Sequence, residues 1–246
     1  MDHNIFWETL AGRVSAAREA NQSPLMIFDL DGTLVEHHYR IYHIFVELAG
    51  ELNFPEYVKA KIFDSNPEKY EYGPSETLRN IGVEDEYVKK MFKPWLDYFL
   101  SNRFLTYDRP IQGAYYFVRN IISLGIRVIY LTGRDLPNMG EGTRTWLRKF
   151  NFLDNSGLTE LNMKTDLSIT NAESKRVACD EIKASGQAVL VVDNEPKELE
   201  FMLSVFPESV GILMDTPNSG IPGRLPWDTL TIKHFDELNS LYSRLL

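Results

Sequence analysis

Two carboxylates stand two residues apart in this chain, Asp29 and Asp31, directly after the apolar run 25–28. A Gly-Thr pair at 32–33 follows them, which is typical of a sharp turn. The apolar run indicates a buried strand, and two acids at the end of such a strand repel each other and cost free energy to desolvate. The pattern therefore predicts a cation beside them, and a metal ion is the commonest one.

Paired carboxylates of this kind can carry out covalent chemistry on an electrophile. One can attack and form a covalent intermediate, as aspartate does in aspartyl-phosphate chemistry. The other can move a proton to the leaving group and later take one from water. When the electrophile is an anionic phosphoryl group, a hard cation such as Mg²⁺ relieves its repulsion from the nucleophile. A surface turn is the alternative explanation, and the apolar run in front of the two acids argues against it.

The elements that must position these acids alternate along the chain. Apolar runs typical of strands cover 25–28, 127–131, 188–192 and 210–214, with a weaker one at 161–164, and helical spacing covers 4–21, 111–124, 142–150 and 172–184. The alternation predicts an α/β fold, a doubly wound, Rossmann-like parallel sheet. Ligands of such sheets bind at the carboxyl ends of the strands, and Asp29, Thr132 and Asp193 each follow a predicted strand.

Helical periodicity interrupted by Pro and Gly replaces this alternation between the first two core strands. We expect a helical domain at 35–108, inserted into a core domain formed by 1–34 and 109–246, with hinges at 35–36 and 107–110. The insert holds half of the aromatic residues, which fit either the core of a small bundle or the wall of a substrate pocket. His37 and His38 follow the first hinge, and we expect a linker there rather than a metal site.

Composition excludes several classes of function. A formal net charge of −9 disfavours a nucleic-acid binder, which would show a basic stripe. No apolar run approaches the roughly 18 residues of a membrane span, and the N-terminus lacks a signal-peptide pattern. The single cysteine, Cys179, excludes an internal disulfide and is expected to be buried in a helix. We therefore expect a cytoplasmic protein without membrane partners; no pattern indicates its oligomeric state.

Residues 28–34, Phe-Asp-Leu-Asp-Gly-Thr-Leu, resemble the first motif of the haloacid dehalogenase-like hydrolase superfamily. The presence of a second acid in this motif, Asp31, resembles the phosphatase and phosphomutase branch of the superfamily. The resemblance implies that Asp29 is the nucleophile, that Asp31 is the general acid/base, and that Mg²⁺ is bound by Asp29 and by the backbone carbonyl of Asp31. It also implies that Gly32 shapes the phosphate site and that the helical insert is a cap, which excludes water and contacts substrate when it closes.

The second motif of the family resembles Thr132-Gly133-Arg134. By that resemblance the Thr132 hydroxyl and the following N–H hold the transferred phosphoryl group, as exposed N–H groups at such a turn can do. Arg134 is expected to pair either with the substrate phosphate or with a nearby acid, and both possibilities stay open.

The third and fourth motifs supply a lysine and a further acid. Lys175 is the preferred lysine because it opens a predicted helix 18 residues before Asp193, and Lys164 is its rival. Asp193 is implied to complete the Mg²⁺ site. Asn194 stands where many members carry a second acid, so we expect it to contact ligand or a metal-bound water, with Glu195 and Glu198 as possible outer acids.

The leading hypothesis is a Mg²⁺-dependent phosphatase that acts on small phosphorylated metabolites through an aspartyl phosphate on Asp29. A phosphotransferase or phosphomutase would use the same core chemistry with a second hydroxyl in place of water. A catalytically silent protein that binds phosphate ligands is the alternative outside enzymes, and the presence of both Asp29 and Asp31 argues against it. The substrate itself cannot be predicted from the fold.

Overall fold

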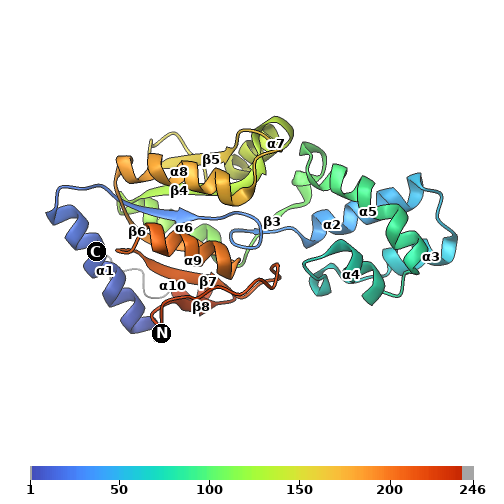
Figure 1. The fold of residues 1–246 in the computed structure, drawn as a ribbon, viewed down its shortest axis with the longest axis horizontal. Coiled ribbons are helices and arrows are strands. Elements are labelled where there is room, and N and C mark those ends of the chain that lie inside the picture. The colour runs from blue at the N-terminus through green and yellow to red at the C-terminus, as the bar shows by residue number, and fades with distance from the viewer. Residues whose placement is uncertain (1, 240–246) are drawn as a thin grey trace.

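A six-stranded parallel sheet is the centre of the molecule (Figure 1), in a computed structural model that describes residues 2–239. Its strand order is β5-β4-β1-β6-β7-β8. The strands are β1 (Pro24–Phe28), β4 (Arg127–Asp135), β5 (Thr159–Lys164), β6 (Gln187–Asp193), β7 (Val210–Met214) and β8 (Leu230–Ile232). The predicted α/β fold with a doubly wound parallel sheet is confirmed.

Helices cover both faces of the sheet because its central strands are apolar on both sides. Met26 and Phe28 of β1 point into one apolar cluster, whereas Leu25 and Ile27 point into another on the opposite face. The first cluster is closed by α1 (His3–Glu19), α6 (Ala114–Ser123), α7 (Leu136–Lys149) and α10 (Asp236–Asn239). The second is closed by α8 (Asn171–Ser185) and α9 (Pro196–Val205), with Cys179 buried in it as predicted.

The chain between β1 and β4 forms a helical insertion, which we define as residues 38–107 and which lies to the right of the sheet in Figure 1. It contains α2 (His38–Glu51), α3 (Glu56–Phe63), η1 (Pro67–Lys69), α4 (Pro74–Asn80), α5 (Asp85–Phe99) and η2 (Asn102–Tyr107). Its buried apolar side chains form a cluster separate from those of the sheet. The division into 1–34 with 109–246 and 35–108 stays a prediction, and residues 240–246 lie outside the described part of the chain.

Two short strands join the helical insertion to the sheet. β2 (Val35–Glu36) and β3 (Arg109–Pro110) pair antiparallel, with Val35 opposite Pro110 and Glu36 opposite Arg109. They coincide with the predicted hinges. The insertion also contacts α7 directly, since the backbone N–H of Gly142 donates to the Asn102 side chain over 2.6 Å.

The helix predicted at 142–150 is longer than its apolar pattern indicates. It begins at Leu136, because the Asp135 carboxylate accepts a hydrogen bond from the backbone N–H of Asn138 over 2.9 Å and caps the first turn. The helix expected from 111 begins at Ala114 instead, after Gly113 with a φ of 79°. Helix α9 was not predicted. Among residues 2–239, no helix is long and apolar enough to span a membrane.

Candidate active site

The carboxyl ends of three adjacent strands bring the predicted site residues together. Phe28 is in register with Tyr130 of β4 and with Val192 of β6, so Asp29 and Asp193 stand one residue beyond this row and Thr132 two. The backbone N–H of Asp29 donates to the carbonyl of Val192 over 3.0 Å and holds the turn against β6. The register therefore places two acids and a hydroxyl side by side, as the sequence predicted.

Lys175 connects two of these strand ends. Its Nζ donates a hydrogen bond of 2.8 Å to Asp193 and lies 3.5 Å from Oδ1 of Asp29 and 3.8 Å from the Glu198 carboxylate. The side chain reaches inward from the second turn of α8, whose first turn is capped by Thr170. Lys164 makes none of these contacts, so of the two lysines it is Lys175 that lies beside Asp29, and its catalytic role stays a prediction.

Asp29 lies in an environment that opposes its ionisation. Burial raises the pKa of its carboxyl well above the ordinary value, and the carboxylates of Asp193 and Asp31 raise it further, while Lys175 acts in the opposite direction. Asp29, Asp193 and Glu198 bring three carboxylates to a single ammonium, that of Lys175. With all three carboxylates ionised, this half of the site would carry two negative charges in excess.

The chemistry of this donor set fits Mg²⁺. A divalent cation would balance the excess charge, and carboxylates are the ligands it prefers. Within residues 2–239 no group of three His, Cys, Asp or Glu side chains is arranged to enclose a metal. Mg²⁺ does not require one, because it is usually held by one or two carboxylates together with substrate oxygens and water. Asp29, Asp193 and the backbone carbonyl of Asp31 are the candidate ligands.

Asp31 lies in a second, electrically balanced cluster. Arg134 donates to both of its oxygens over 2.7 Å, and Arg40 of α2 donates to Oδ1 over 2.5 Å. The same two arginines flank Asp108, at 2.7 Å for Arg134 and 3.1 Å for Arg40. Although burial acts to raise it, the guanidiniums of Arg134 and Arg40 hold the pKa of Asp31 well below its usual range. We call these four residues the Arg40 network.

Sequence reasoning missed Arg40 and Asp108. Both side chains are fully buried, and the plane of Arg40 also packs over the Phe99 ring at 4.1 Å. Arg40 is one of four charged or polar residues near the first hinge, and Asp108 precedes an Arg-Pro pair in the second. Opposite charges beside the two hinges of an insertion are a sequence signal from which an ion pair between Arg40 and Asp108 could have been predicted. Arg134 was predicted to contact phosphate or an acid, and in this structure it contacts acids.

Two glycines are required by close approaches at the site. Gly32 has a φ of 80°, and a Cβ there would lie 2.2 Å from the Asn194 amide nitrogen. That amide donates to the carbonyl of Pro217 over 3.0 Å, so it is fixed in place. A Cβ on Gly133 would lie within 3 Å of the Asn171 amide. Asn194 is thus brought against the turn that follows Asp29, and its contact with a ligand or a metal-bound water stays a prediction.

The site opens into a cavity of about 520 Å³ between the sheet and the helical insertion. The sheet side contributes the predicted residues Asp29, Asp31, Thr132, Gly133, Arg134, Lys175, Asp193 and Asn194, together with Lys164 and Asn171. The insertion contributes an apolar wall formed by Tyr72, Phe92, Trp95, Phe99 and Leu100. Gly32 lies just outside, against Asn194. Some aromatic residues of the insertion therefore line a pocket and others pack in its core.

His37 lies in the same cavity, at the start of the insertion. Its Nδ1 is 3.9 Å from Asp31, and burial lowers the pKa of its imidazole to about 3 even though Asp31 acts to raise it. His38 instead lies 3.6 Å from Glu36. The two rings are partly packed, as the linker interpretation predicted.

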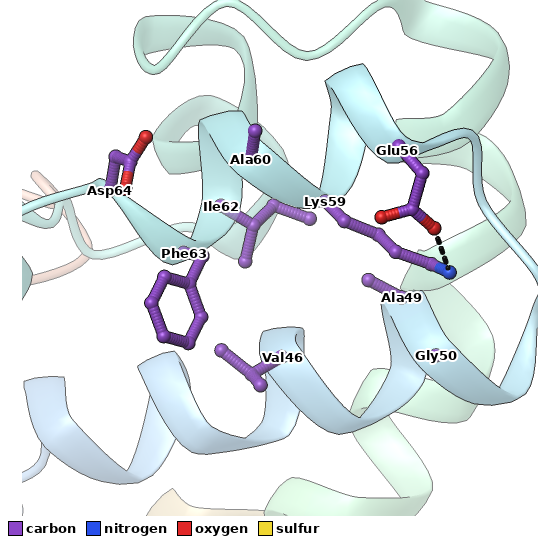
Figure 2. A pocket seen from close by; sticks show the side chains of 9 residues that line it. All are labelled: Val46, Ala49, Gly50, Glu56, Lys59, Ala60, Ile62, Phe63 and Asp64. Carbon is purple, nitrogen blue, oxygen red and sulfur yellow. Dashed lines mark hydrogen bonds and ion pairs between the residues drawn. The ribbon is translucent and has the colours of Figure 1, made fainter.

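A second hollow lies within the helical insertion, between α2 and α3 (Figure 2). It is lined mainly by Val46, Ala49, Ile62 and Phe63, and a Lys59–Glu56 ion pair of 2.9 Å lies at its edge. It contains none of the residues that the sequence singled out, so the strand-end cavity is the candidate active site.

Comparison with known proteins identifies the family. The model of the haloacid dehalogenase-like hydrolases matches residues 24–204, so the chain belongs to this family of hydrolases. No curated protein matches the sequence.

Solved structures share the fold at low sequence identity. They include the Mycobacterium tuberculosis Protein Tyrosine Kinase A, at 17% identity and a TM-score of 0.55 over 90% of this chain and 98% of that one. A haloacid dehalogenase-like hydrolase from Streptococcus pneumoniae matches at 15% identity and a TM-score of 0.51 over 90% and 99%. A hydrolase of the superfamily from Ehrlichia chaffeensis matches at 12% and 0.52 over 91% and 98%. Likeness at this level concerns the fold alone.

Proposed function

We propose that this protein is a Mg²⁺-dependent phosphatase that hydrolyses small phosphorylated metabolites through an aspartyl phosphate on Asp29. The observation that carries the proposal is the position of the Asp29 carboxylate. It borders the cavity, 3.5 Å from the buried ammonium of Lys175, one strand away from Thr132 and Gly133. A nucleophile, a counter-charge and an anion-binding strand end thus face one space.

The reaction divides into two displacements at phosphorus. An oxygen of Asp29 attacks phosphorus while the bond to the ester oxygen breaks, and the ester oxygen leaves as an alcohol after taking a proton from Asp31. Water then attacks the same phosphorus, the bond to Asp29 breaks, and inorganic phosphate leaves. Thr132 and the N–H that follows it bind the phosphoryl oxygens, and Lys175 offsets their charge. When bound, Mg²⁺ supplies further neutralisation of phosphoryl charge.

Proton transfer is assigned to Asp31, and its contacts set a condition on that role. Both oxygens of Asp31 accept hydrogen bonds from Arg134, and Oδ1 also accepts one from Arg40. These guanidiniums also keep Asp31 ionised by lowering its pKa, so at least one of the contacts must be released before Asp31 can carry the proton that the leaving oxygen takes. Because Arg40 belongs to the helical insertion, a small displacement of the insertion would release one of these contacts.

We further propose that the helical insertion acts as a cap and that the protein works in the cytoplasm on a soluble substrate. The cavity between the two parts supports the first point, since one wall comes from each. Closure would exclude bulk water from the reacting phosphoryl group.

Phosphate release from p-nitrophenyl phosphate tests the proposal. We expect turnover with Mg²⁺, its loss in EDTA, and its loss in Asp29→Asn even with Mg²⁺. Asp31→Asn should slow turnover most with poor leaving groups. Equal rates with Mg²⁺, with EDTA and in Asp29→Asn would exclude the mechanism. Transfer to an added alcohol would indicate a phosphotransferase, and tight binding of phosphate esters without turnover would indicate a silent binding protein.

A further inference from the structure

A second lysine enters the active-site cavity without an ion pair among residues 2–239. Lys164 ends β5, the edge strand beside β4, and its residue is only 6% exposed. Among residues 2–239, its Nζ makes one hydrogen bond, of 3.3 Å, to the side-chain oxygen of Asn171. No carboxylate in that part of the chain lies within ion-pair distance of it.

Such a position is costly for an ammonium group. A buried charge loses hydration, and this loss is normally offset by an opposite charge. Lys175 shows the usual solution, with three carboxylates within 4 Å. The acid nearest to Lys164 along the chain is Asp166, whose oxygen accepts hydrogen bonds from the N–H and hydroxyl of Ser168 at 2.7 and 2.6 Å. These bonds lower the pKa of the Asp166 carboxyl most, and the charge of Lys164 lowers it less.

An aromatic side chain of the helical insertion lines the same cavity. Trp95 of α5 lines the cavity wall and is 6% exposed, and its indole N–H has no acceptor among the described residues. Its ring stacks on Phe99 with the centroids 4.7 Å apart, which fixes its position. Phe92 and Leu167 add apolar surface to the lining. The cavity therefore offers a cation beside an apolar surface.

The backbone of Lys164 is well separated from that of Asp29. β5 and β1 flank β4, so the backbones of Lys164 and Asp29 are two strand spacings apart, about 10 Å. The side-chain amide of Asn171 lies between Lys164 and Asp29. Its oxygen accepts the hydrogen bond from Lys164, and its atoms would lie within 3 Å of a Cβ placed on Gly133 of β4. An anion at Lys164 is thus reached by a substrate whose other end is at Asp29.

We propose that Lys164 and Asn171 bind a second anionic group of the substrate, a carboxylate or a further phosphate, so that the preferred substrates are phosphate monoesters bearing two separated anions. This inference rests on the proposed phosphatase function and specifies its substrate class. The part of the substrate between the two anions lies along the apolar wall formed by Phe92, Trp95 and Leu167.

Matched aryl phosphates test the role of Lys164. The probes are the three positional isomers of carboxyphenyl phosphate, each compared with the carbamoylphenyl phosphate of the same shape and no charge. We expect the wild type to prefer at least one acid over its amide by about tenfold or more in kcat/KM, the range of a charge-assisted hydrogen bond. Lys164→Met should bring that ratio to about one, whereas Lys164→Arg should keep most of it. Lys183→Met, an exposed lysine of α8, is the matched control.

The ratio distinguishes this role from others, because a loss common to both probes cancels. A fall in rate on acid and amide alike, with the ratio preserved, would place Lys164 at the transferred phosphoryl group and overturn the proposal. So would a wild type without preference for any acid isomer.

Binding separates this inference from the proposed function. If no aryl phosphate is turned over, the phosphatase proposal fails, and calorimetric titration with the corresponding carboxyphenyl and carbamoylphenyl phosphonates still tests the site. Tighter binding of an acid by the wild type, lost in Lys164→Met, supports the second anion position, and equal binding of acid and amide overturns it.

Discussion

Removal of Arg40 should destabilise the whole protein, because this one side chain joins the helical insertion to the sheet through buried charges. Its guanidinium is fully buried between Asp31, at 2.5 Å, and Asp108, at 3.1 Å. The substitution Arg40→Met keeps an apolar chain of similar length for packing against Phe99. It leaves Asp108 fully buried with Arg134 as its remaining cation.

The magnitude follows from the partner left behind. Removal of one member of a buried ion pair typically costs 3–5 kcal/mol, because the other charge stays desolvated. Asp108 keeps its 2.7 Å contact to Arg134, so the lower end, about 3 kcal/mol, applies. For a chain of this size that corresponds to a fall in Tm of about 6–12 °C. Arg40→Lys should lie between, since an ammonium cannot present the planar fork that serves two acids.

Thermal unfolding followed by circular dichroism measures the effect. Arg79→Met is the control, because Arg79 pairs with Asp85 at a similar 2.8 Å distance, but on the surface. In the double variant Arg40→Met with Asp108→Asn, the losses should be less than additive, since the buried charge has been removed. A shift for Arg40→Met no larger than that for Arg79→Met, or full additivity in the double variant, would refute this account of the Arg40 network.

Three further predictions concern the turn, the metal and pH. Gly32→Ala should lower the free energy of unfolding by at least about 1 kcal/mol more than Gly82→Ala. Both glycines have a positive φ, but only a Cβ on Gly32 would meet a neighbour, the Asn194 amide. Equal losses for the two variants in urea titrations would contradict the close approach. Mg²⁺ at about ten times its Kd should raise stability by about 1.4 kcal/mol, seen as a higher Tm that EDTA reverses and that Asp193→Asn reduces; an unchanged Tm would argue against a cation site. His37 has its pKa lowered to about 3 in the folded state, so the unfolded chain takes up the proton first as pH falls below about 6.5, and stability is lost. Between pH 7 and pH 5 the wild type should lose about 2 kcal/mol more than His37→Asn, and parallel pH profiles would show that the ring is not held neutral.

The sequence predicted those features of the fold and the site that depend on short, continuous residue patterns. Apolar runs located all of the central strands, and because parallel strands end at one edge, Asp29, Thr132 and Asp193 had to meet. The spacing to Asp193 selected Lys175 over Lys164. The ion pair of 2.8 Å between Lys175 and Asp193 agrees with that choice. The catalytic and metal-binding roles of these residues stay predictions.

The parts that sequence missed depend on contacts between distant segments. Nothing in the helical pattern of 38–51 shows that Arg40 is buried, because burial there results from Asp31 and Asp108, which come from two other segments. The charge state of Asp31 is set by arginines 9 and 103 residues away in the chain. The early start of α7 depends on a side-chain cap at Asp135, which apolar periodicity does not record.

The antiparallel pairing of β2 with β3 has a consequence for how such a protein can change over time. The chain leaves the sheet region at Val35 and returns at Pro110, and these two residues are direct partners. Everything between them is therefore inserted at a single point, and strand order in the sheet does not depend on what is inserted. A segment of quite different length or shape could be exchanged there, altering what the cavity accepts while the strand ends that hold Asp29 and Asp193 stay as they are.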